Sequence, residues 1–271
     1  MKTIKNKYIN ALKSTICIMC VCFAVLNICA APSSEAFGWY FNKNENHLPP
    51  ALPSEFRFID SSDGYYLDKN AREDDKVIYL TFDVGYENGN VAKILDALKK
   101  HSAKGAFFIL SNVIDREPDL VMRMKNEGHL ICNHTAKHKD MSKVTDHDAF
   151  CNELKSLDDK YYSFSGTHLD PFYRPPEGRF NESNLKDASS IGYKTVFWSY
   201  AYADWDNNKQ MNPDKAYEKV MNHVHNGMVI LLHPTSATNA EIMDRLLCGF
   251  EELGYRFGDL YELTGTEKGN I

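Results

Sequence analysis

Short apolar runs alternate along the chain with segments whose apolar residues recur every three or four positions. The run VIYLTFD, residues 77–83, is typical of a buried strand. The segment after it predicts a helix with one apolar face, formed by Val91, Ile94, Leu95 and Leu98. Further strands are predicted in GAFFIL, HLICNH, PFYRPP, YKTVFWSY, MVILLH and YRFGDLYEL, and further helices over about 118–127, 147–161, 182–190, 213–225 and 239–254. Asn239 is the expected N-cap of the last of these helices.

Strand and helix alternate about seven times after residue 76, which predicts an α/β fold with a mainly parallel sheet. Such a sheet is either doubly wound or closed into a barrel. The segment DVGYENGN after the first strand matches neither glycine-rich phosphate-loop pattern, which favours a barrel over a nucleotide-binding fold. Residues 37–75 instead mix aromatic residues with Pro, Asn and Asp, and predict an irregular N-terminal extension that packs on the main body.

Residues 1–36 differ from the rest of the chain of 271 residues. A lysine-rich start, the uncharged run 14–31 and small residues near Ala36 are typical of a secretory signal peptide. An uncleaved N-terminal membrane anchor is the alternative. These residues carry four lysines and one glutamate, so without them the formal net charge of −6 becomes −9. An acidic chain without basic runs argues against nucleic acid as a partner, and we expect an exported protein.

Three cysteines lie beyond residue 36, too few for a disulfide scaffold: Cys132, Cys151 and Cys248. Cys132 is expected to be a buried core residue rather than a metal ligand. The aromatic residues of AFFIL and VFWSY are also expected in the core, and a groove position for Trp198 and Tyr200 is the alternative. His223 and His225 are expected at the surface.

Polar residues with catalytic or metal-binding chemistry follow most of the predicted strands: Asp83, His134, His138, Arg174, Asp204 and His233. His134 and His138 are four residues apart, a spacing that brings two imidazoles together on one metal ion or leaves two solvated surface histidines. Each residue taken alone has an ordinary structural explanation. The carboxyl ends of parallel strands, however, lie on one side of the sheet, so the whole set is expected to converge in one site.

Five motifs in this set resemble those of the polysaccharide deacetylases, carbohydrate esterase family 4: TFDVG (81–85), HTAKH (134–138), RPPEG (174–178), DW (204–205) and LLH (231–233). The resemblance covers about residues 76–263. FGWYF and DVGYENGN are similar to the delta-lactam-biosynthetic de-N-acetylases of spore-forming bacteria, which act on muramic acid in spore cortex peptidoglycan. The family resemblance implies a distorted (β/α) barrel, with the catalytic domain over residues 76–265.

The resemblance also implies roles for the strand-end residues in the hydrolysis of an N-acetyl group. Asp83 would be the general base, held ionised by Arg174, and His233 the general acid. Asp204 would favour the imidazolium form of His233 or orient the Arg174 network. A divalent metal ion, expected to be zinc, would be held by His134 and His138.

Three further residues are expected to contact the substrate. Trp205 and Leu231 would line the pocket for the acetyl methyl group. The backbone N–H of Glu177, or of a neighbour, would stabilise the oxyanion, because Pro176 has no N–H.

Val84 departs from the family pattern, which places a third, oxygen-bearing metal ligand at this position. The metal could bind weakly through two histidines, Glu87 or Asn88 could supply the missing ligand, or metal and activity could be lost. We favour weak metal binding with retained activity, because the other catalytic residues are all present.

The implied activity is N-deacetylation of peptidoglycan glycan strands, on peptide-free muramic acid residues, leading to muramic delta-lactam in spore cortex. A functional coupling to an N-acetylmuramoyl amidase would follow, since stem peptides must first be removed. The expected location is the cell wall or the outer face of the membrane, and the forespore intermembrane space if the protein is specific to sporulation. Alternatives are a catalytically impaired wall-binding protein and a chitin- or xylan-type deacetylase.

Overall fold

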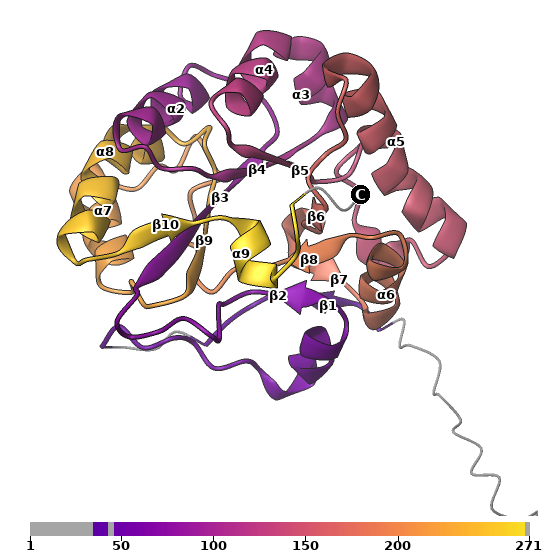
Figure 1. The fold of residues 1–271 in the computed structure, drawn as a ribbon, viewed down its shortest axis with the longest axis horizontal. Helices are drawn as coiled ribbons and strands as arrows, with labels where there is room; N and C mark the ends of the chain where they lie inside the picture. The colour runs from indigo at the N-terminus through magenta and orange to yellow at the C-terminus, as the bar shows by residue number, and fades with distance from the viewer. Residues whose placement is uncertain (1–34, 43–45, 269–271) are drawn as a thin grey trace, which may run out of the picture. The chain divides into compact units, whose positions relative to one another are not determined.

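A computed structural model describes residues 35–42 and 46–268 of the chain (Figure 1). The predicted signal segment, residues 1–36, lies outside the described residues except for its last two positions. Within the described ranges, no helix has the length and apolar character needed to cross a membrane.

An eight-stranded sheet, in which all the strand pairings are parallel, forms the centre of the fold. β3 (Val77–Val84) pairs with three strands, β4 (Ala106–Ile109), β9 (Met228–Leu232) and β10 (Arg256–Gly258). From β4 the order continues through β5 (Leu130–Asn133), β6 (Phe172–Tyr173) and β8 (Lys194–Val196) to β2 (Gly64–Tyr65). After β8, Tyr200 bridges to Ile230 of β9, so the curled sheet meets itself as the predicted distorted barrel requires.

Helices surround this sheet (Figure 1). They are α2 (Val91–Lys100), α3 (Ser111–Arg116), α4 (Pro118–Asn126), α5 (His147–Ser165), α6 (Glu182–Ser190), α7 (Pro213–Met221), α8 (Ala237–Glu252) and α9 (Leu260–Thr264). The predicted apolar face of α2 is confirmed, since its four residues are all fully buried. The predicted cap of α8 is wrong. Ser236 is the N-cap and accepts a hydrogen bond from the Asn239 N–H at 3.1 Å, while Asn239 lies inside the helix.

The segment before β3 is largely irregular but not wholly so. β1 (Phe37–Gly38) pairs antiparallel with β7 (Arg179–Phe180), and a 3-10 helix covers Ser54–Ser61. Trp39 stacks on Phe56 and Phe197, with ring centroids 5.4 and 4.5 Å apart. β2 joins the main sheet beside β8. A strand of two residues has no periodic pattern, which is why the sequence does not predict it.

The alternation of side chains along β3 separates two layers of core. Ile78, Leu80, Phe82 and Val84 lie in the large apolar cluster that also contains the buried faces of α2 and α8. Val77 and Tyr79 belong to a second cluster, together with Cys132 of β5, which is fully buried as predicted. Successive residues of a strand point to opposite faces, so Asp83 follows Tyr79 and Thr81 on the inner face while Val84 turns to the outer core.

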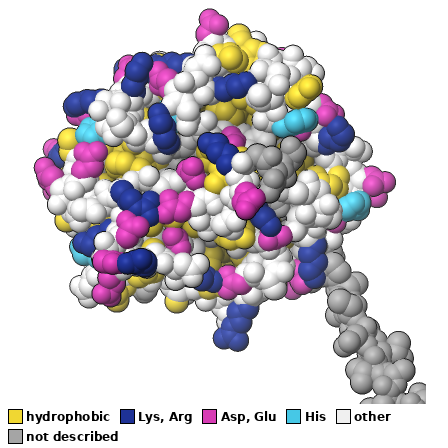
Figure 2. Space-filling model, viewed as in Figure 1, with side chains coloured by type: hydrophobic (Ala, Val, Ile, Leu, Met, Phe, Trp, Pro, Cys, Tyr) yellow, Lys and Arg dark blue, Asp and Glu magenta, His cyan; other side chains and the backbone are white. Residues whose placement is uncertain are grey.

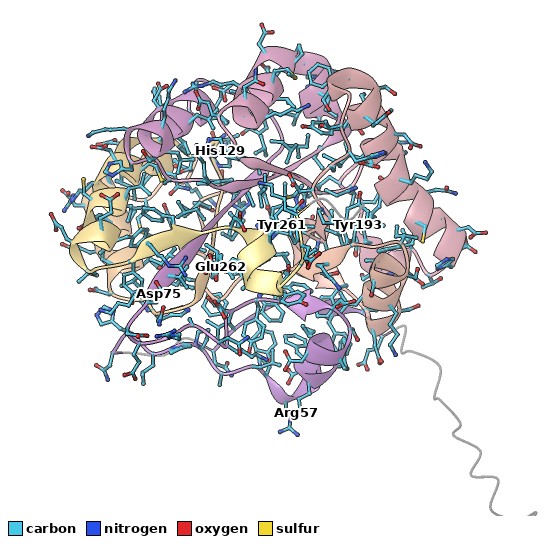
Figure 3. The ribbon with its side chains drawn as sticks, viewed as in Figure 1. Arg57, Asp75, His129, Tyr193, Tyr261 and Glu262 are labelled. Carbon is cyan, nitrogen blue, oxygen red and sulfur yellow. The ribbon has the colours of Figure 1, made fainter. Side chains whose placement is uncertain are left out.

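Basic and acidic side chains are interspersed on the face shown in Figure 2. Arg256 of β10 illustrates this mixing, since its guanidinium donates to Asp75 at 2.6 Å and to Glu262 at 2.9 Å (Figure 3 labels both acids). This pairing ties β10 to the residue that lies two positions before β3. Exposed ion pairs of this kind add little stability, about 0–1 kcal/mol each.

Candidate active site

The predicted strand-end residues converge at the carboxyl ends of β3, β5 and β9. A cavity of about 680 Å³ opens there. Seven of the predicted site residues line it: Asp83, His134, His138, Glu177, Trp205, Leu231 and His233. Arg174 and Asp204 are not among the lining residues, and each lies behind one of them. The set is therefore arranged as a lined cavity with two buried supporting charges.

Arg174 is fully buried and holds Asp83 from behind. Its Nη1 donates to Asp83 Oδ1 at 2.9 Å, and Nη2 donates to Thr81 Oγ1 at 2.9 Å. Backbone carbonyls accept its remaining contacts, from Nε to Val196 at 2.9 Å and from Nη2 to Phe197 at 3.1 Å. A guanidinium bonded on all sides cannot move away, so the cation stays beside the carboxylate.

The electrostatics keep Asp83 ionised. Burial acts to raise the pKa of its carboxyl, but the interactions with His134, with the Arg174 guanidinium and with His233 together outweigh burial and hold that pKa below its usual value. The side chain is only 10% exposed. A buried carboxylate that stays charged and faces a cavity is suited to accept a proton from a bound water molecule.

His134 and His138 lie side by side, although the turn between them is not helical. Their ring centroids are 5.1 Å apart. Thr135 and His138 adopt left-handed backbone conformations, with φ of 74° and 53°, and the His138 N–H donates to Thr135 Oγ1 at 2.9 Å. A β-branched residue rarely adopts this conformation, so the surrounding structure imposes it.

The tautomer of His134 follows from its partner. Nδ1 lies 2.9 Å from the Arg174 carbonyl, which only accepts, so Nδ1 carries the proton and Nε2 keeps its lone pair. Nε2 lies 3.6 Å from Asp83 Oδ2. Burial lowers the pKa of His134 to about 4, so the ring is neutral near pH 7. A neutral imidazole with a free nitrogen, oriented by a backbone carbonyl, is the form that binds metal ions.

The donor set fits a divalent cation held by two imidazoles, and no third ligand joins them among the residues that the structure describes. Val84 is fully buried in apolar surroundings. Glu87 accepts from the N–H groups of Gly89 and Val91 at the start of α2, and Asn88 donates to the Thr235 carbonyl at 2.8 Å. Neither lines the cavity, so neither takes the rescuing role considered from the sequence.

Asp204 supports His233, which decides between the two roles considered for it. Its Oδ1 lies 2.7 Å from His233 Nδ1, and its Oδ2 accepts from the His233 N–H at 2.9 Å. Burial acts to lower the pKa of His233, but the Asp204 carboxylate outweighs it and raises that pKa. Asp204 therefore favours the protonated form of the ring, in which the other nitrogen can donate a proton.

Asn239 was missed as a site residue, because its position near a helix start resembles a cap. Its amide donates to Asp204 Oδ2 at 2.6 Å and to the His233 carbonyl at 3.0 Å. Its own oxygen accepts from the Tyr202 hydroxyl. Only the folded chain brings these three residues together, so no local sequence signal could have identified the contact.

Aromatic side chains form much of the cavity wall. Trp205 is 62% exposed, and the centroid of its ring lies 6.2 Å from the centroid of the His233 ring. Trp198 lines the cavity, which agrees with the groove position considered for it from the sequence. Tyr200 is buried in the core instead. Tyr86 and Tyr202 complete the aromatic lining.

The loop at residues 176–178 approaches the cavity closely. Glu177 and Gly178 both have positive φ, 56° and 64°, and a Cβ on Gly178 would lie 2.9 Å from the Trp198 ring. The Gly178 N–H donates to the Pro175 carbonyl at 3.0 Å. Because its N–H is already bonded, Gly178 is not available to donate to the oxyanion. The Glu177 N–H remains the predicted donor.

One expectation outside the cavity is wrong. His225 is buried rather than exposed, with its Nε2 2.8 Å from Ser199 Oγ. Burial lowers its pKa to about 4. His223 is partly buried, and its ring stacks on Tyr200 with centroids 5.3 Å apart. The contacts of both histidines, with Ser199 and Tyr200, therefore come from the segment after β8.

Known proteins resemble the chain over most of its length. Residues 70–196 match the sequence profile of the polysaccharide deacetylase family. The chain is 39% identical over 253 residues to the peptidoglycan-N-acetylmuramic acid deacetylase PdaA of Bacillus subtilis strain 168, covering 91% of this chain and 94% of that protein. The solved structure of Bacillus subtilis PdaA, a family 4 carbohydrate esterase, matches with a TM-score of 0.81 and 36% identity, covering 87% of this chain and 100% of that one.

A second similar structure is a variant of BA3943, a pseudoenzyme of carbohydrate esterase family 4 from Bacillus anthracis, in which enzymatic activity has been restored. It matches with a TM-score of 0.66 and 25% identity, covering 74% of this chain and 71% of that one. The same fold thus occurs in proteins with and without activity.

Proposed function

Because the chain belongs to the polysaccharide deacetylase family, carbohydrate esterase family 4, we propose that it hydrolyses the N-acetyl group of peptidoglycan amino sugars. The proposed substrate is N-acetylmuramic acid on peptide-free glycan strands. One observation carries this proposal: the Asp83 carboxylate and the His233 imidazolium line a single cavity, each held by its own buried partner.

Asp83 is the general base in this proposal. A water molecule beside its carboxylate loses a proton to it and attacks the acetyl carbonyl carbon. Arg174 keeps the carboxylate charged and fixed in direction before the reaction starts. An anionic base needs this support, since a freely rotating carboxylate would lose orientation and rate.

His233 is the general acid, which protonates the departing sugar amine. Its Nδ1–H is held by Asp204, so its other nitrogen is the one that donates toward the cavity. Leu231 and Trp205 would hold the acetyl methyl group, and the Glu177 N–H would bind the developing oxyanion. All of these groups belong to the wall of one cavity, as an acyl-transfer site requires.

Deacetylases of this family generally depend on a metal ion. A divalent cation, which we propose to be zinc, would be held by His134 and His138 and would supply Lewis-acid polarisation of the acetyl carbonyl. With only two protein ligands, the affinity would be lower than in a site with three.

Removing the acetyl group frees an amine that can close on the lactyl carboxylate of muramic acid into a delta-lactam. This ring forms only where no stem peptide occupies the carboxylate, so an N-acetylmuramoyl amidase would act first. We propose that the chain is exported and works at the cell wall or the outer face of the membrane, and in the forespore intermembrane space if it is specific to sporulation.

The decisive experiment is mass spectrometry of peptide-free glycan strands after incubation with the protein, with and without a chelator. Loss of one acetyl mass per muramic acid, with release of acetate, is the expected result. Strands built only from glucosamine units should react more slowly. Equal or faster reaction on glucosamine units, or on chitin or xylan, would contradict the proposed substrate.

Val84 favours a second candidate function, a catalytically impaired protein that binds the cell wall. Such a protein would bind denuded strands without releasing acetate, with or without added zinc. Binding measured on the same strands therefore separates the two candidates. Acetate release that disappears in Asp83→Asn supports the enzyme.

A further inference from the structure

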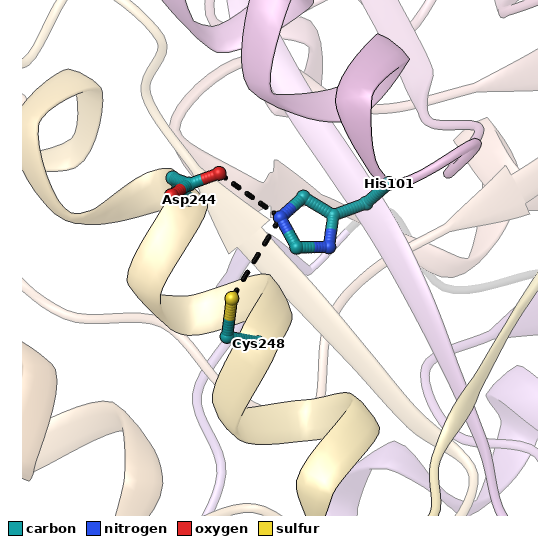
Figure 4. Close-up of side chains that lie close together, drawn as sticks. All are labelled: His101, Asp244 and Cys248. Carbon is teal, nitrogen blue, oxygen red and sulfur yellow. Dashed lines mark hydrogen bonds and ion pairs between the residues drawn. The ribbon is translucent and has the colours of Figure 1, made fainter.

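A second group of metal-binding side chains lies between α2 and α8, away from the cavity lining. His101 is the C-cap residue of α2, and Asp244 and Cys248 lie one turn apart on α8. One nitrogen, one oxygen and one sulfur of these residues lie within 4.8 Å of one another, the only cluster of this kind among residues 35–42 and 46–268. Figure 4 shows the two α8 side chains directed at one ring nitrogen of His101.

The atoms are close to the spacing that a tetrahedral zinc ion needs. His101 Nε2 lies 3.0 Å from Asp244 Oδ1 and 3.9 Å from Cys248 Sγ. Ligand atoms around tetrahedral zinc, with bonds of about 2.0–2.3 Å, are roughly 3.3–3.6 Å apart. The two distances from His101 Nε2 thus bracket this spacing.

The other ring nitrogen of His101 already has the partner that a zinc-bound histidine requires. Nδ1 lies 2.9 Å from Glu251 Oε2, on the same helix α8. A carboxylate on Nδ1 keeps the proton there and leaves the Nε2 lone pair for a metal. The His101 side chain is only 8% exposed, so this orientation is held by its surroundings.

The Lys100 ammonium group is the cation now paired with Asp244, one of the three candidate metal ligands. Its Nζ lies 2.6 and 2.9 Å from the two oxygens of Asp244. The lysine side chain is 64% exposed, so it can move into solvent when another cation binds. Its charge would compete with a metal ion for Asp244.

We propose that His101, Asp244 and Cys248 bind one zinc ion, with water as the fourth ligand. The set of nitrogen, oxygen and sulfur donors suits zinc better than calcium or magnesium, which prefer oxygen alone. The Cys248 thiol releases its proton to solvent when it binds. The ion joins α2, the helix that follows β3, to α8, the helix that follows β9. Asp83 lies in β3, and His233 directly follows β9. It stabilises the folded state without taking part in the reaction.

Cobalt(II) titration of the full chain tests the proposal, because a cobalt–thiolate bond gives a near-ultraviolet charge-transfer band. We expect the band in the wild-type chain and its loss in Cys248→Ser and His101→Gln. Cys151→Ser is the matched control and should keep the band, although Cys151 also lies beside a histidine, with Sγ 3.7 Å from His147 Nε2. The double variant His134→Ala/His138→Ala should also keep it.

Two results would overturn the proposal: a wild-type chain with no band, or a band that persists in Cys248→Ser. Thermal unfolding with zinc gives an independent measurement. The comparison is made in His134→Ala/His138→Ala, which lacks the proposed active-site ligands. Its melting temperature should rise with added zinc, and adding Cys248→Ser to this double variant should abolish the rise.

Lys100→Gln distinguishes a metal site from an ion-pair network in which a protonated His101 bridges two carboxylates. Removing the competing cation should lower the zinc concentration needed for half of the shift in melting temperature. An unchanged concentration would contradict the competition, and would favour the ion-pair network.

Discussion

The Asp83–Arg174 pair and the His233–Asp204 pair serve one cavity, with the signs of their charges exchanged. In the first, a carboxylate faces the cavity and a buried cation supports it. In the second, an imidazole faces the cavity and a buried carboxylate supports it. The side chains of the two supporting residues are 0% and 1% exposed, whereas Asp83 and His233 are 10% and 26% exposed. Burying the supporting charge strengthens its effect, because little solvent screens it.

The two supports move the pKa values of the facing groups apart. Arg174 helps to lower the pKa of Asp83, and Asp204 raises the pKa of His233. The first support thus favours the carboxylate that accepts a proton, and the second favours the imidazolium that donates one. Titratable groups separated in this way are the usual assignment of base and acid.

Removing the base should have the largest effect on activity. Asp83→Asn keeps the shape of the side chain but cannot accept the proton of the attacking water. We expect acetate release to fall roughly 10²- to 10⁴-fold. Asp206→Asn, outside the cavity lining, is the control and should leave the rate unchanged. A rate in Asp83→Asn within a few-fold of the wild-type chain would refute the assignment.

Removing the support of Asp83 should cost stability as well as activity. Arg174→Met leaves a buried carboxylate without its cation, which typically costs about 3–5 kcal/mol. Urea denaturation measures this loss. The double variant Asp83→Asn/Arg174→Met should be more stable than Arg174→Met, because no buried charge is then unpaired. If it is not, the two residues are not coupled as we describe.

The pH dependence of stability should distinguish the two pairs. The pKa of Asp83 is lowered on folding, so this group stabilises the fold above the ordinary aspartate pKa, and the contribution is lost as pH falls through the lowered value. The pKa of His233 is raised, so its contribution is full below the ordinary histidine pKa and is lost as pH rises through the raised value.

Removing the support of His233 should shift the pH profile of activity. The protonated fraction of His233 falls as pH rises through its pKa, and this sets the alkaline limit. Asp204→Asn lowers that pKa, so we expect the alkaline limb of kcat to move down by about one to three pH units. Asn239→Ala keeps the Asp204 charge and should shift the limb less. Equal shifts in both variants would mean that hydrogen bonding, not charge, controls His233.

The smallest expected effect comes from adding a metal ligand next to Asp83. Val84 packs in the outer core, so in Val84→Asp the new carboxylate must turn from the end of β3 toward His134 and His138. We expect tighter metal binding, because the change then supplies the charged oxygen donor of the family pattern. Without metal, the same variant should be less stable, since the position is fully buried. Elemental analysis measures metal content, with Val84→Ala as the control. Unchanged metal content in a folded Val84→Asp chain would show that position 84 does not reach the metal.

Local periodicity was enough to predict much of this molecule. The apolar face of α2 and the alternation along β3 repeat over many residues, so each signal is read without knowing its neighbours. The order of polar residues at strand ends predicted the convergence of Asp83, His134 and His233, because parallel strands end on one side of a sheet.

The partners behind the cavity depended on the tertiary structure. Asn239 contacts Asp204 from 35 residues away, and Arg174 reaches Asp83 across 91. Buried His225 contacts Ser199, 26 positions earlier in the chain, and Trp198 lines the cavity from a run of core residues. Such contacts join positions far apart in the sequence, where local patterns carry no information. The sequence by itself therefore determined the strand-end residues and, through the family resemblance, the pairing of Arg174 with Asp83. Only the folded chain decided between the two roles considered for Asp204 and placed Asn239 behind it, because these contacts join distant segments.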